Sequence, residues 1–360
     1  HAKHFYRNLC GFNSQLRLQM RNTLQINIKP FVHFKQPVHQ AASSHRRFAM
    51  THYPHRDNID HQRRLLLGAM AATALPAGLL LSESTQAAPP KIKSSARIVI
   101  AGAGAAGLSA ASFLAKRLES AEITLVDGRT DHYYQPGFTL VAAGIQPPGY
   151  TRSQTADYLP ANVKWIRGYV AEFDPEGNSI TTTAGQKIPY DFLLVTTGLK
   201  LDYAAIDGMD EALIGQNGLG SIYHSPEAAF KTWQLLDRFA NNGGEAVFLR
   251  PATEMKCSGA PLKYTFIVRD YLYRRGTLKK SKLTYNAHND SLFSVPIVSE
   301  RVRMLFEARN VDIRHHRVLS AIDPGRRIAV FSSEKEGKVE LPYDFINVIP
   351  PMCAPDVVKN

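Results

Sequence analysis

The sequence predicts an α/β protein with two Rossmann-like domains, and three observations lead to this prediction. A β-branched run from Arg97 to Ala101 is followed by a glycine turn and by an apolar-periodic stretch, Leu108 to Leu118, that predicts a helix. A second strand, Glu122 to Val126, ends in Asp127. A later strand, Glu245 to Leu249, enters another turn and helix. Strands that alternate with helices in this way predict parallel sheets.

Composition and charge limit the class of protein. With 360 residues, 44% of them hydrophobic, the chain is long enough to bury the cores of two domains. The formal net charge is +12, but residues 1–93 hold 13 Lys or Arg and 3 Asp or Glu, which leaves only +2 for the rest. A basic leader beside a nearly neutral body indicates targeting, so we expect no nucleic-acid partner.

The leader has the order of a secretory signal. Residues 1–49 show no sustained apolar period, and we interpret them as an untranslated or unstructured leader. A polar segment, Arg63-Arg64, an apolar run ending at Leu81 and small residues then follow, so we interpret residues 50–88 as a twin-arginine-like signal peptide, although the preferred Ser and Phe are absent. An uncleaved anchor helix is the alternative, but a span needs about 20 apolar residues. We expect a periplasmic protein, peripheral on the cytoplasmic membrane.

The first turn carries three glycines with separate tasks. Gly102 permits a tight turn, Gly104 lets the backbone approach a pyrophosphate, and Gly107 lets the helix pack on the strand. The helix N-terminus, where Ala105 and Ala106 lie, faces the phosphate charge. These residues predict a dinucleotide-binding turn.

Two further features complete the predicted dinucleotide site. Asp127 stands twenty residues beyond Gly107, where a carboxylate can bind ribose hydroxyls. The glycine motif alone does not separate FAD from NAD. A later apolar strand that begins at Tyr190 runs into Thr197-Gly198, which resembles the strand and turn that close the FAD domain of two-dinucleotide flavoproteins. We therefore expect FAD as the cofactor.

The second strand-to-helix turn differs from the first. Two-dinucleotide flavoproteins usually carry a second glycine motif there for the nicotinamide coenzyme, whereas this turn, Arg250 to Cys257, has no glycine. Pro251 also lacks the N–H that could bind a phosphate. We expect a second Rossmann-like domain without its nicotinamide ligand, so that electrons enter or leave by a molecule other than NAD(P)H.

Over roughly residues 96–360 the chain resembles the sulfide:quinone oxidoreductase family, particularly the branch that includes the mitochondrial enzymes. The most specific matches are His132–Val141, Lys256–Pro261 and Pro350–Val357. The resemblance implies two Rossmann-like domains of the disulfide-reductase type, FAD, an active cysteine at Cys257, and sulfide, a membrane quinone and a small-molecule sulfur acceptor as partners. It also implies that Gln135 and Val170 contact FAD.

One departure from the family concerns the second redox cysteine, which the family carries after the Pro-Pro-Met motif and which we expect beyond Asn360. We interpret the chain as a fragment that lacks the C-terminal part, including the helices that dock on the bilayer. Cys353 is interpreted as a small residue near the flavin. The expected domains are residues 96–205 (first part of the FAD domain), 206–330 (second domain) and 331–360 (return to the FAD domain).

Cys257 is the expected catalytic thiol. It follows Lys256 and precedes a helix expected from Ala260 to Arg274, so a cation and a helix N-terminus both favour the thiolate. The alternative, a buried inert cysteine, fits poorly with the flanking Lys, Ser and Gly. The resemblance implies that sulfide attacks a disulfide or trisulfide between Cys257 and the downstream cysteine, after which two electrons pass to FAD and then to quinone.

No metal site is expected. Cys10, Cys257 and Cys353 are too scattered for zinc ligands. His315 and His316 lie in a strand expected from Val311 to Val318, where adjacent side chains point to opposite faces.

Two rival functions remain open. One is the flavoprotein subunit of a flavocytochrome c sulfide dehydrogenase, which passes electrons to a cytochrome c. The other is a catalytically silent FAD-binding module.

Overall fold

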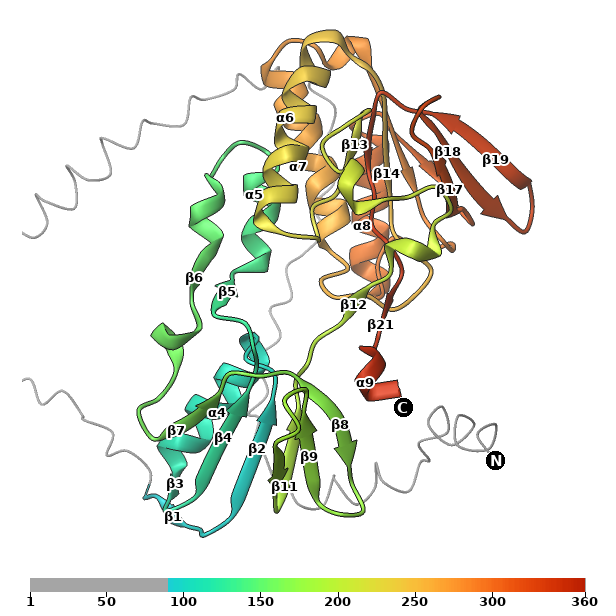
Figure 1. Cartoon of the computed structure of the whole chain (residues 1–360). Helices are drawn as coiled ribbons and strands as arrows, with labels where there is room; N and C mark the ends of the chain where they lie inside the picture. The colour runs from blue at the N-terminus through green and yellow to red at the C-terminus, as the bar shows by residue number, and fades with distance from the viewer. Residues whose placement is uncertain (1–89, 360) are drawn as a thin grey trace, which may run out of the picture. The chain divides into compact units, whose positions relative to one another are not determined.

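A computed structural model of the chain describes residues 90–359 (Figure 1). The chain divides into two units at Ser84 and Thr85, and the described residues belong to the second. The predicted leader and signal peptide lie outside the described residues. Within residues 90–359 no helix is long and apolar enough to cross a membrane.

The first large sheet has four parallel strands in the order β11-β2-β4-β7. These strands are β2 (Arg97–Ala101), β4 (Glu122–Val126), β7 (Val163–Ile166) and β11 (Phe192–Val195). Helix α4 (Ala105–Arg117) packs on one face, and the antiparallel sheet of β8 (Val170–Asp174), β9 (Ser179–Thr182) and β10 (Lys187–Pro189) packs on the other.

The uninterrupted apolar run of β2 after Arg97 explains why both faces of this sheet are covered. Ile98 and Ile100 are buried against α4, where they meet Leu108, whereas Val99 is buried with Ile188 on the opposite face. Successive side chains of a strand point to opposite faces, so an uninterrupted apolar strand is buried on both.

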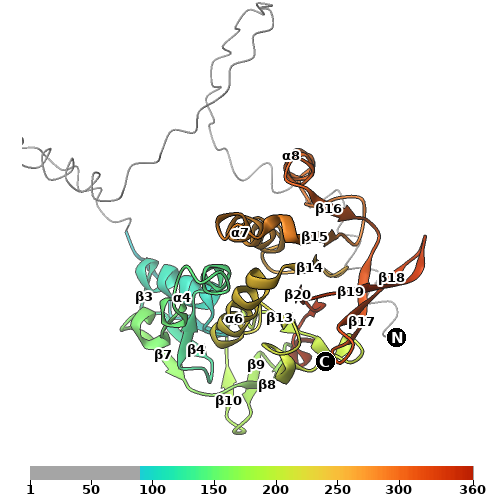
Figure 2. The same cartoon turned by 90° about the horizontal axis from the view of Figure 1, so that it is seen from above.

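The second large sheet has five parallel strands in the order β13-β20-β14-β15-β16. They are β13 (Leu219–Gly220), β14 (Gly244–Leu249), β15 (Ser281–Asn286), β16 (Val311–Arg314) and β20 (Phe345–Asn347). Its helices are α6 (Pro226–Asn242), α7 (Ala260–Arg274) and α8 (Pro296–Glu307). In Figure 2, α6 and α7 lie on one side of this sheet and the antiparallel strands β17 (Val318–Asp323), β18 (Ile328–Ser333) and β19 (Gly337–Pro342) lie on the other. The predicted α/β fold with two Rossmann-like domains is confirmed.

Shorter elements join these sheets. The helices α5 (Phe138–Val141) and α9 (Asp356–Lys359) are single turns, and three strand pairs have two or three residues in each strand. The pairs are β1 (Ile92–Lys93) with β3 (Leu118–Glu119), β5 (Asp131–Tyr133) with β6 (Arg152–Gln154), and β12 (Lys200–Leu201) with β21 (Met352–Cys353).

The prediction of a continuous strand through the two histidines is wrong. Strand β16 ends at Arg314, and His316 has φ 57, a left-handed conformation that a strand does not contain. His315 Nδ1 lies 2.9 Å from the Asn289 carbonyl oxygen, and His316 Nε2 lies 2.6 Å from an Asp290 oxygen. Hydrogen bonds to the loop after β15 therefore turn the chain out of the sheet before β17 begins.

Candidate functional site

The first glycine turn brings three segments of the first domain together. Gly102 has φ 108, a conformation that favours glycine, and its N–H donates to the Val126 carbonyl at 2.8 Å. A Cβ on Gly102 would lie 2.5 Å from the Thr196 carbonyl oxygen. The turn after β11 therefore passes directly against the turn after β2, and this close approach requires glycine.

The other two glycines have opposite surroundings. A Cβ on Gly107 would lie 1.8 Å from the Gly102 carbonyl oxygen, whereas a Cβ on Gly104 would meet nothing within 4 Å. Gly107 is thus required for close packing inside the turn, and Gly104 borders open space at the N-terminus of α4. Ala105 and Ala106 begin α4 and are exposed. The turn fits the pyrophosphate of a dinucleotide, because open backbone and free helical N–H groups face the same space.

Asp127 lies at the carboxyl end of β4 and is only 4% exposed. One carboxylate oxygen accepts from the Ala103 N–H at 2.7 Å, and both oxygens accept from Arg129. Burial alone would raise the pKa of Asp127, but the hydrogen bonds from Arg129 and Ala103 outweigh it, so the pKa lies below its ordinary value. Asp127 is therefore held as a carboxylate beside the glycine turn.

Arg129 is a site residue that sequence reasoning missed. Its guanidinium pairs with Asp127 at 2.9 Å, and hydrogen bonding to Asp127 raises its pKa. The sequence could have pointed to Arg129, because it lies two residues after Asp127 in a polar segment outside any strand.

The remaining predicted cofactor residues divide into two groups. Thr197 and Gly198 follow β11, and Gly198 has φ 76; a Cβ on Gly102 would lie 3.1 Å from the Thr197 Cα. These two residues therefore border the glycine turn. Val170 begins β8 and is half-buried, and Gln135 begins the 3₁₀ turn η1 (Gln135–Gly137) with an exposed side chain that makes no hydrogen bond to a described residue. Contact of Gln135 and Val170 with FAD stays a prediction.

Cys257 lies in a tight turn just before α7. It is exposed, its thiol is free, and it has φ 51, which is strained for a residue with a Cβ. The Cys257 carbonyl oxygen accepts from the Tyr223 hydroxyl at 2.9 Å and from the Ala260 N–H at 2.9 Å. Two hydrogen bonds to one carbonyl hold the thiol at the surface in a conformation that the residue alone would not favour.

Lys256 connects this turn electrostatically with the first domain. Its pKa is lowered, first by burial and second by the charge of Arg129. Because Arg129 pairs with Asp127, the turn that carries Cys257 lies in the electrostatic range of the dinucleotide site. A catalytic role for Lys256 and Cys257 stays a prediction.

Hydrogen bonds made by residues in or next to them bring together the three segments that carry the family resemblance. The Tyr264 hydroxyl, on α7, donates to the Ala142 carbonyl at 2.9 Å, immediately after the segment that ends at Val141. The Met352 N–H donates to the Thr253 hydroxyl at 2.9 Å and so ties the Pro-Pro-Met segment to the loop before Cys257. Segments that are far apart in the sequence therefore meet around the turn that carries Cys257.

Cys353 is half-buried on β21, and its thiol is free. The Lys359 ammonium donates to its sulfur at 3.4 Å. Within residues 90–359 no group of three or more His, Cys, Asp or Glu side chains is arranged to hold a metal ion.

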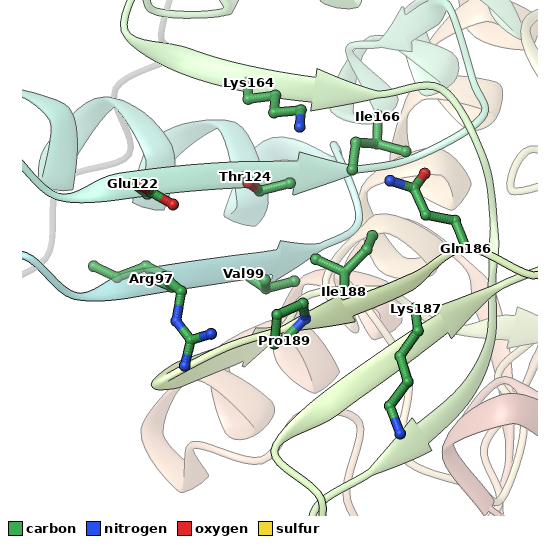
Figure 3. A pocket seen from close by; sticks show the side chains of 11 residues that line it. Arg97, Val99, Glu122, Thr124, Lys164, Ile166, Gln186, Lys187, Ile188 and Pro189 are labelled. Atoms are coloured by element: carbon green, nitrogen blue, oxygen red, sulfur yellow. The ribbon is translucent and has the colours of Figure 1, made fainter.

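A separate pocket of about 200 Å³ lies between the first sheet and the strand β10 (Figure 3). Arg97, Glu122 and Lys164 line it at or near the amino ends of their strands. The glycine turn, Asp127 and Gly198 follow the carboxyl ends of the same sheet. Ligands of open α/β sheets bind at the carboxyl ends, so this pocket lies apart from the dinucleotide site.

Comparisons with known proteins agree with this geometry. Residues 96–244 match the family described as pyridine nucleotide-disulphide oxidoreductase. The chain is 36% identical over 271 residues to the mitochondrial sulfide:quinone oxidoreductase of Dictyostelium discoideum, which covers 75% of this chain and 59% of that protein. It is 32% identical over 265 residues to the mitochondrial sulfide:quinone oxidoreductase of Mus musculus, with 73% of this chain and 58% of that protein covered.

Among solved structures, the sulfide:quinone oxidoreductase of Aquifex aeolicus superposes with a TM-score of 0.62 at 25% identity, over 73% of this chain and 60% of that chain. The chain thus spans about three fifths of the length of these relatives. The predicted disulfide-reductase type of fold is confirmed.

Proposed function

Because the chain belongs to the sulfide:quinone oxidoreductase family, we propose that it is an enzyme that oxidises sulfide to persulfide or sulfane sulfur and passes the electrons to a quinone. FAD is the cofactor of its first domain, in agreement with the prediction from sequence. The observation that supports the proposal most is the exposed, free thiol of Cys257 on a strained turn close to the dinucleotide site. Strain at an exposed nucleophile is typical of functional sites.

The residues of the first domain have distinct tasks toward FAD. The backbone of Gly102 to Gly107 and the N-terminus of α4 would hold the pyrophosphate, and Asp127 would accept from the ribose hydroxyls. Ala103 and Arg129 already donate four hydrogen bonds to the two oxygens of this carboxylate, so a ribose hydroxyl would take the place of one donated by the Arg129 guanidinium. When bound, FAD supplies the two-electron redox chemistry that these side chains lack.

Cys257 is the proposed nucleophilic centre. Hydrosulfide attacks a disulfide between Cys257 and a second cysteine of the full protein; one S–S bond forms, one breaks, and a persulfide and a thiolate result. This exchange transfers no net electrons, so the cycle requires the two-electron acceptor that the first domain binds. Tyr223 and Ala260 hold the turn through the Cys257 carbonyl. The role proposed for Lys256, the preceding residue, is to favour the thiolate product by its positive charge.

Acceptors and location complete the proposal. A membrane quinone takes the electrons, a small molecule takes the persulfide sulfur, and the protein contacts the membrane peripherally through a part that follows the present chain. The signal-like residues 50–88 support a periplasmic location, whereas the names of the mouse and Dictyostelium relatives include a mitochondrial one. Fractionation of cells that express the complete gene decides between these compartments.

Two matched cysteine variants test the role of Cys257. Cys257→Ser should bind FAD as the wild type does and lose quinone reduction by sulfide, because a hydroxyl cannot form the S–S bonds of the cycle. Cys353→Ser should retain this activity and serves as the control. Sulfide-dependent quinone reduction by Cys257→Ser would refute the proposed role. Reduction of a cytochrome c in place of quinone would favour the flavocytochrome alternative.

A further inference from the structure

Polar atoms without partners gather at one edge of the second sheet. Among residues 90–359, eight enclosed side-chain nitrogen and oxygen atoms have no hydrogen-bond partner, and six of them belong to residues at the carboxyl ends of β14, β15 and β20. These six are Arg250 Nε, Tyr285 Oη, Asn286 Oδ1, His288 Nδ1 and both amide atoms of Asn347. Buried polar groups nearly always have partners, so a cluster of exceptions indicates a missing ligand or water. In open α/β sheets this edge is the ligand-binding edge.

Arg250 is the most unusual member of the cluster. It follows β14 directly and is only 9% exposed, yet its side chain makes no hydrogen bond or ion pair with a described residue. Its two terminal nitrogens are not among the enclosed atoms, so they face space that solvent can enter. A cation that is nine-tenths buried and has no carboxylate partner is unfavourable, and an anion bound where its terminal nitrogens are accessible would offset that cost.

The charge of Arg250 acts on the hydroxyls of Tyr223 and Tyr285. Burial raises the pKa of Tyr223, the charges of Cys257 and Tyr285 add to the shift, and the charge of Arg250 opposes it. Burial likewise raises the pKa of Tyr285 against the charge of Arg250. Both phenols therefore remain neutral, and of the two the Tyr285 hydroxyl has no hydrogen-bond partner among the described residues. Because the Tyr223 hydroxyl also donates to the Cys257 carbonyl at 2.9 Å, this group lies next to the thiol turn.

A pocket of about 460 Å³ gives access to the same edge. His288 and His316 line it, together with Ser332 and Lys338. Burial lowers the pKa of His288, and the charge of Arg250 lowers it further, while Glu254 opposes both. Arg250 therefore lies within electrostatic range of this pocket. Carboxylates are also present there: Glu334 lines the pocket, and Asp290 pairs with the lining His316 at 2.6 Å.

We propose that Arg250, with the hydroxyl of Tyr285, binds a small inorganic anion at the carboxyl edge of the second sheet, next to the turn of Cys257. The site offers N–H and O–H donors around a cation and lacks the glycine backbone that a nucleotide phosphate chain requires. It occupies the place at which related domains bind a coenzyme. The identity of the anion rests on the proposed function. It is an ionised sulfur species, either the substrate hydrosulfide or a sulfur oxyanion that accepts the sulfane sulfur.

Calorimetric titration of the FAD-loaded full-length protein with sodium sulfate tests the site without any reaction. Wild type should bind sulfate at one site, and Arg250→Gln should lose at least about tenfold in affinity, since a charge-assisted hydrogen bond is removed. Arg301→Gln removes the same charge from the exposed surface of α8 and should bind as the wild type does. Tyr285→Phe keeps the ring, should fold normally by FAD content and urea midpoint, and should weaken sulfate binding.

Steady-state kinetics then separate the two sources of the anion. If the anion is hydrosulfide, Arg250→Gln raises KM for sulfide by about tenfold with kcat little changed, and sulfate competes with sulfide in the wild type only. If it is the sulfur acceptor, KM for an oxyanion acceptor rises and KM for sulfide does not.

The proposal is overturned if neither sulfate affinity nor either KM depends on Arg250. A wild type without any sulfide oxidation would refute the proposed function, and the sulfate titration would still decide whether the anion site exists.

Discussion

The two strand-to-helix turns of this chain occupy equivalent places in two similar domains, yet their chemistry is opposite. After β2, the first turn carries Gly102, Gly104 and Gly107, and its helix begins at Ala105. After β14, the second turn runs through residues 250–259 without a glycine until its last position, and it begins with a buried Arg-Pro pair. The first turn presents backbone to a ligand, and the second presents side chains.

This difference shows how one topology supports two kinds of recognition. A glycine turn brings N–H groups close to a phosphate because no Cβ intervenes. When residues with side chains replace the glycines, the same sheet edge is filled, and any ligand must be bound by side chains such as Arg250 and exposed groups such as Cys257. Substitutions in both turns test this comparison.

The largest effect is expected at Gly107. In Gly107→Ala the new Cβ would lie 1.8 Å from the Gly102 carbonyl oxygen and 2.8 Å from the Thr196 hydroxyl, and the Gly102 backbone cannot yield. The free energy of unfolding should fall by roughly 3 kcal/mol or more, with loss of bound FAD. Urea denaturation followed by circular dichroism measures this change. An unchanged midpoint would contradict the described packing of the first turn.

Asp127→Asn should have an intermediate effect and a characteristic pH dependence. The folded-state pKa of Asp127 lies below its ordinary value, so its ionisation stabilises the fold above about pH 4 and this contribution is lost as the pH falls through the folded pKa. At neutral pH the free energy of unfolding of the variant should be lower by about 1–3 kcal/mol, because the ion pair with Arg129 is broken. The free energy of unfolding of the variant should depend less on pH in the acid range than that of the wild type. If the two proteins give parallel curves of unfolding free energy against pH, the Asp127 carboxylate does not stabilise the fold in this way.

A smaller effect is expected in the second turn. Cys257 has φ 51, which costs a residue with a Cβ roughly 1–2 kcal/mol and costs glycine little. Cys257→Gly should therefore be more stable than Cys257→Ala by about 1 kcal/mol, although both lack the thiol. Thermal unfolding of the two variants gives the difference, and a less stable glycine variant would show that the turn is not strained.

The smallest effect on stability is expected at Gly104. No atom lies within 4 Å of a Cβ at this position, and its φ of −71 suits any residue. Gly104→Ala should change the free energy of unfolding by less than about 0.5 kcal/mol and should weaken FAD binding, because the methyl group enters the space expected for the pyrophosphate. Equilibrium dialysis of FAD measures the second quantity, and unchanged affinity would place the cofactor elsewhere.

Patterns that depend on neighbours in sequence were predictable. The strands Arg97–Ala101 and Glu122–Val126 and the helix Ala260–Arg274 have the predicted bounds. Short apolar runs and the turn residues beside them fix these bounds locally. Helix α4 begins at Ala105, three residues before its apolar stripe, because the glycine turn ends there.

Contacts between distant segments were not predictable from a single sequence. The Thr196 carbonyl against Gly102, the Tyr223 hydroxyl on Cys257 and the ion pair of Arg129 with Asp127 all depend on how turns meet in space. The positive φ of Cys257 and of His316 likewise results from such hydrogen bonds. For that reason the residues that position the turn were missed, whereas Cys257 was predicted as the catalytic thiol from its neighbours in sequence, and that role stays a prediction.

Anaerobic titration of the FAD-loaded full-length protein with sulfide, followed by a soluble quinone, shows whether sulfide reduces the flavin through Cys257. Sulfide should bleach the visible flavin band of the wild type, quinone should restore it, and Cys257→Ser should show no bleaching. If the wild-type flavin stays oxidised under excess sulfide, FAD is bound but sulfide and Cys257 do not reduce it, and the proposed electron transfer is wrong.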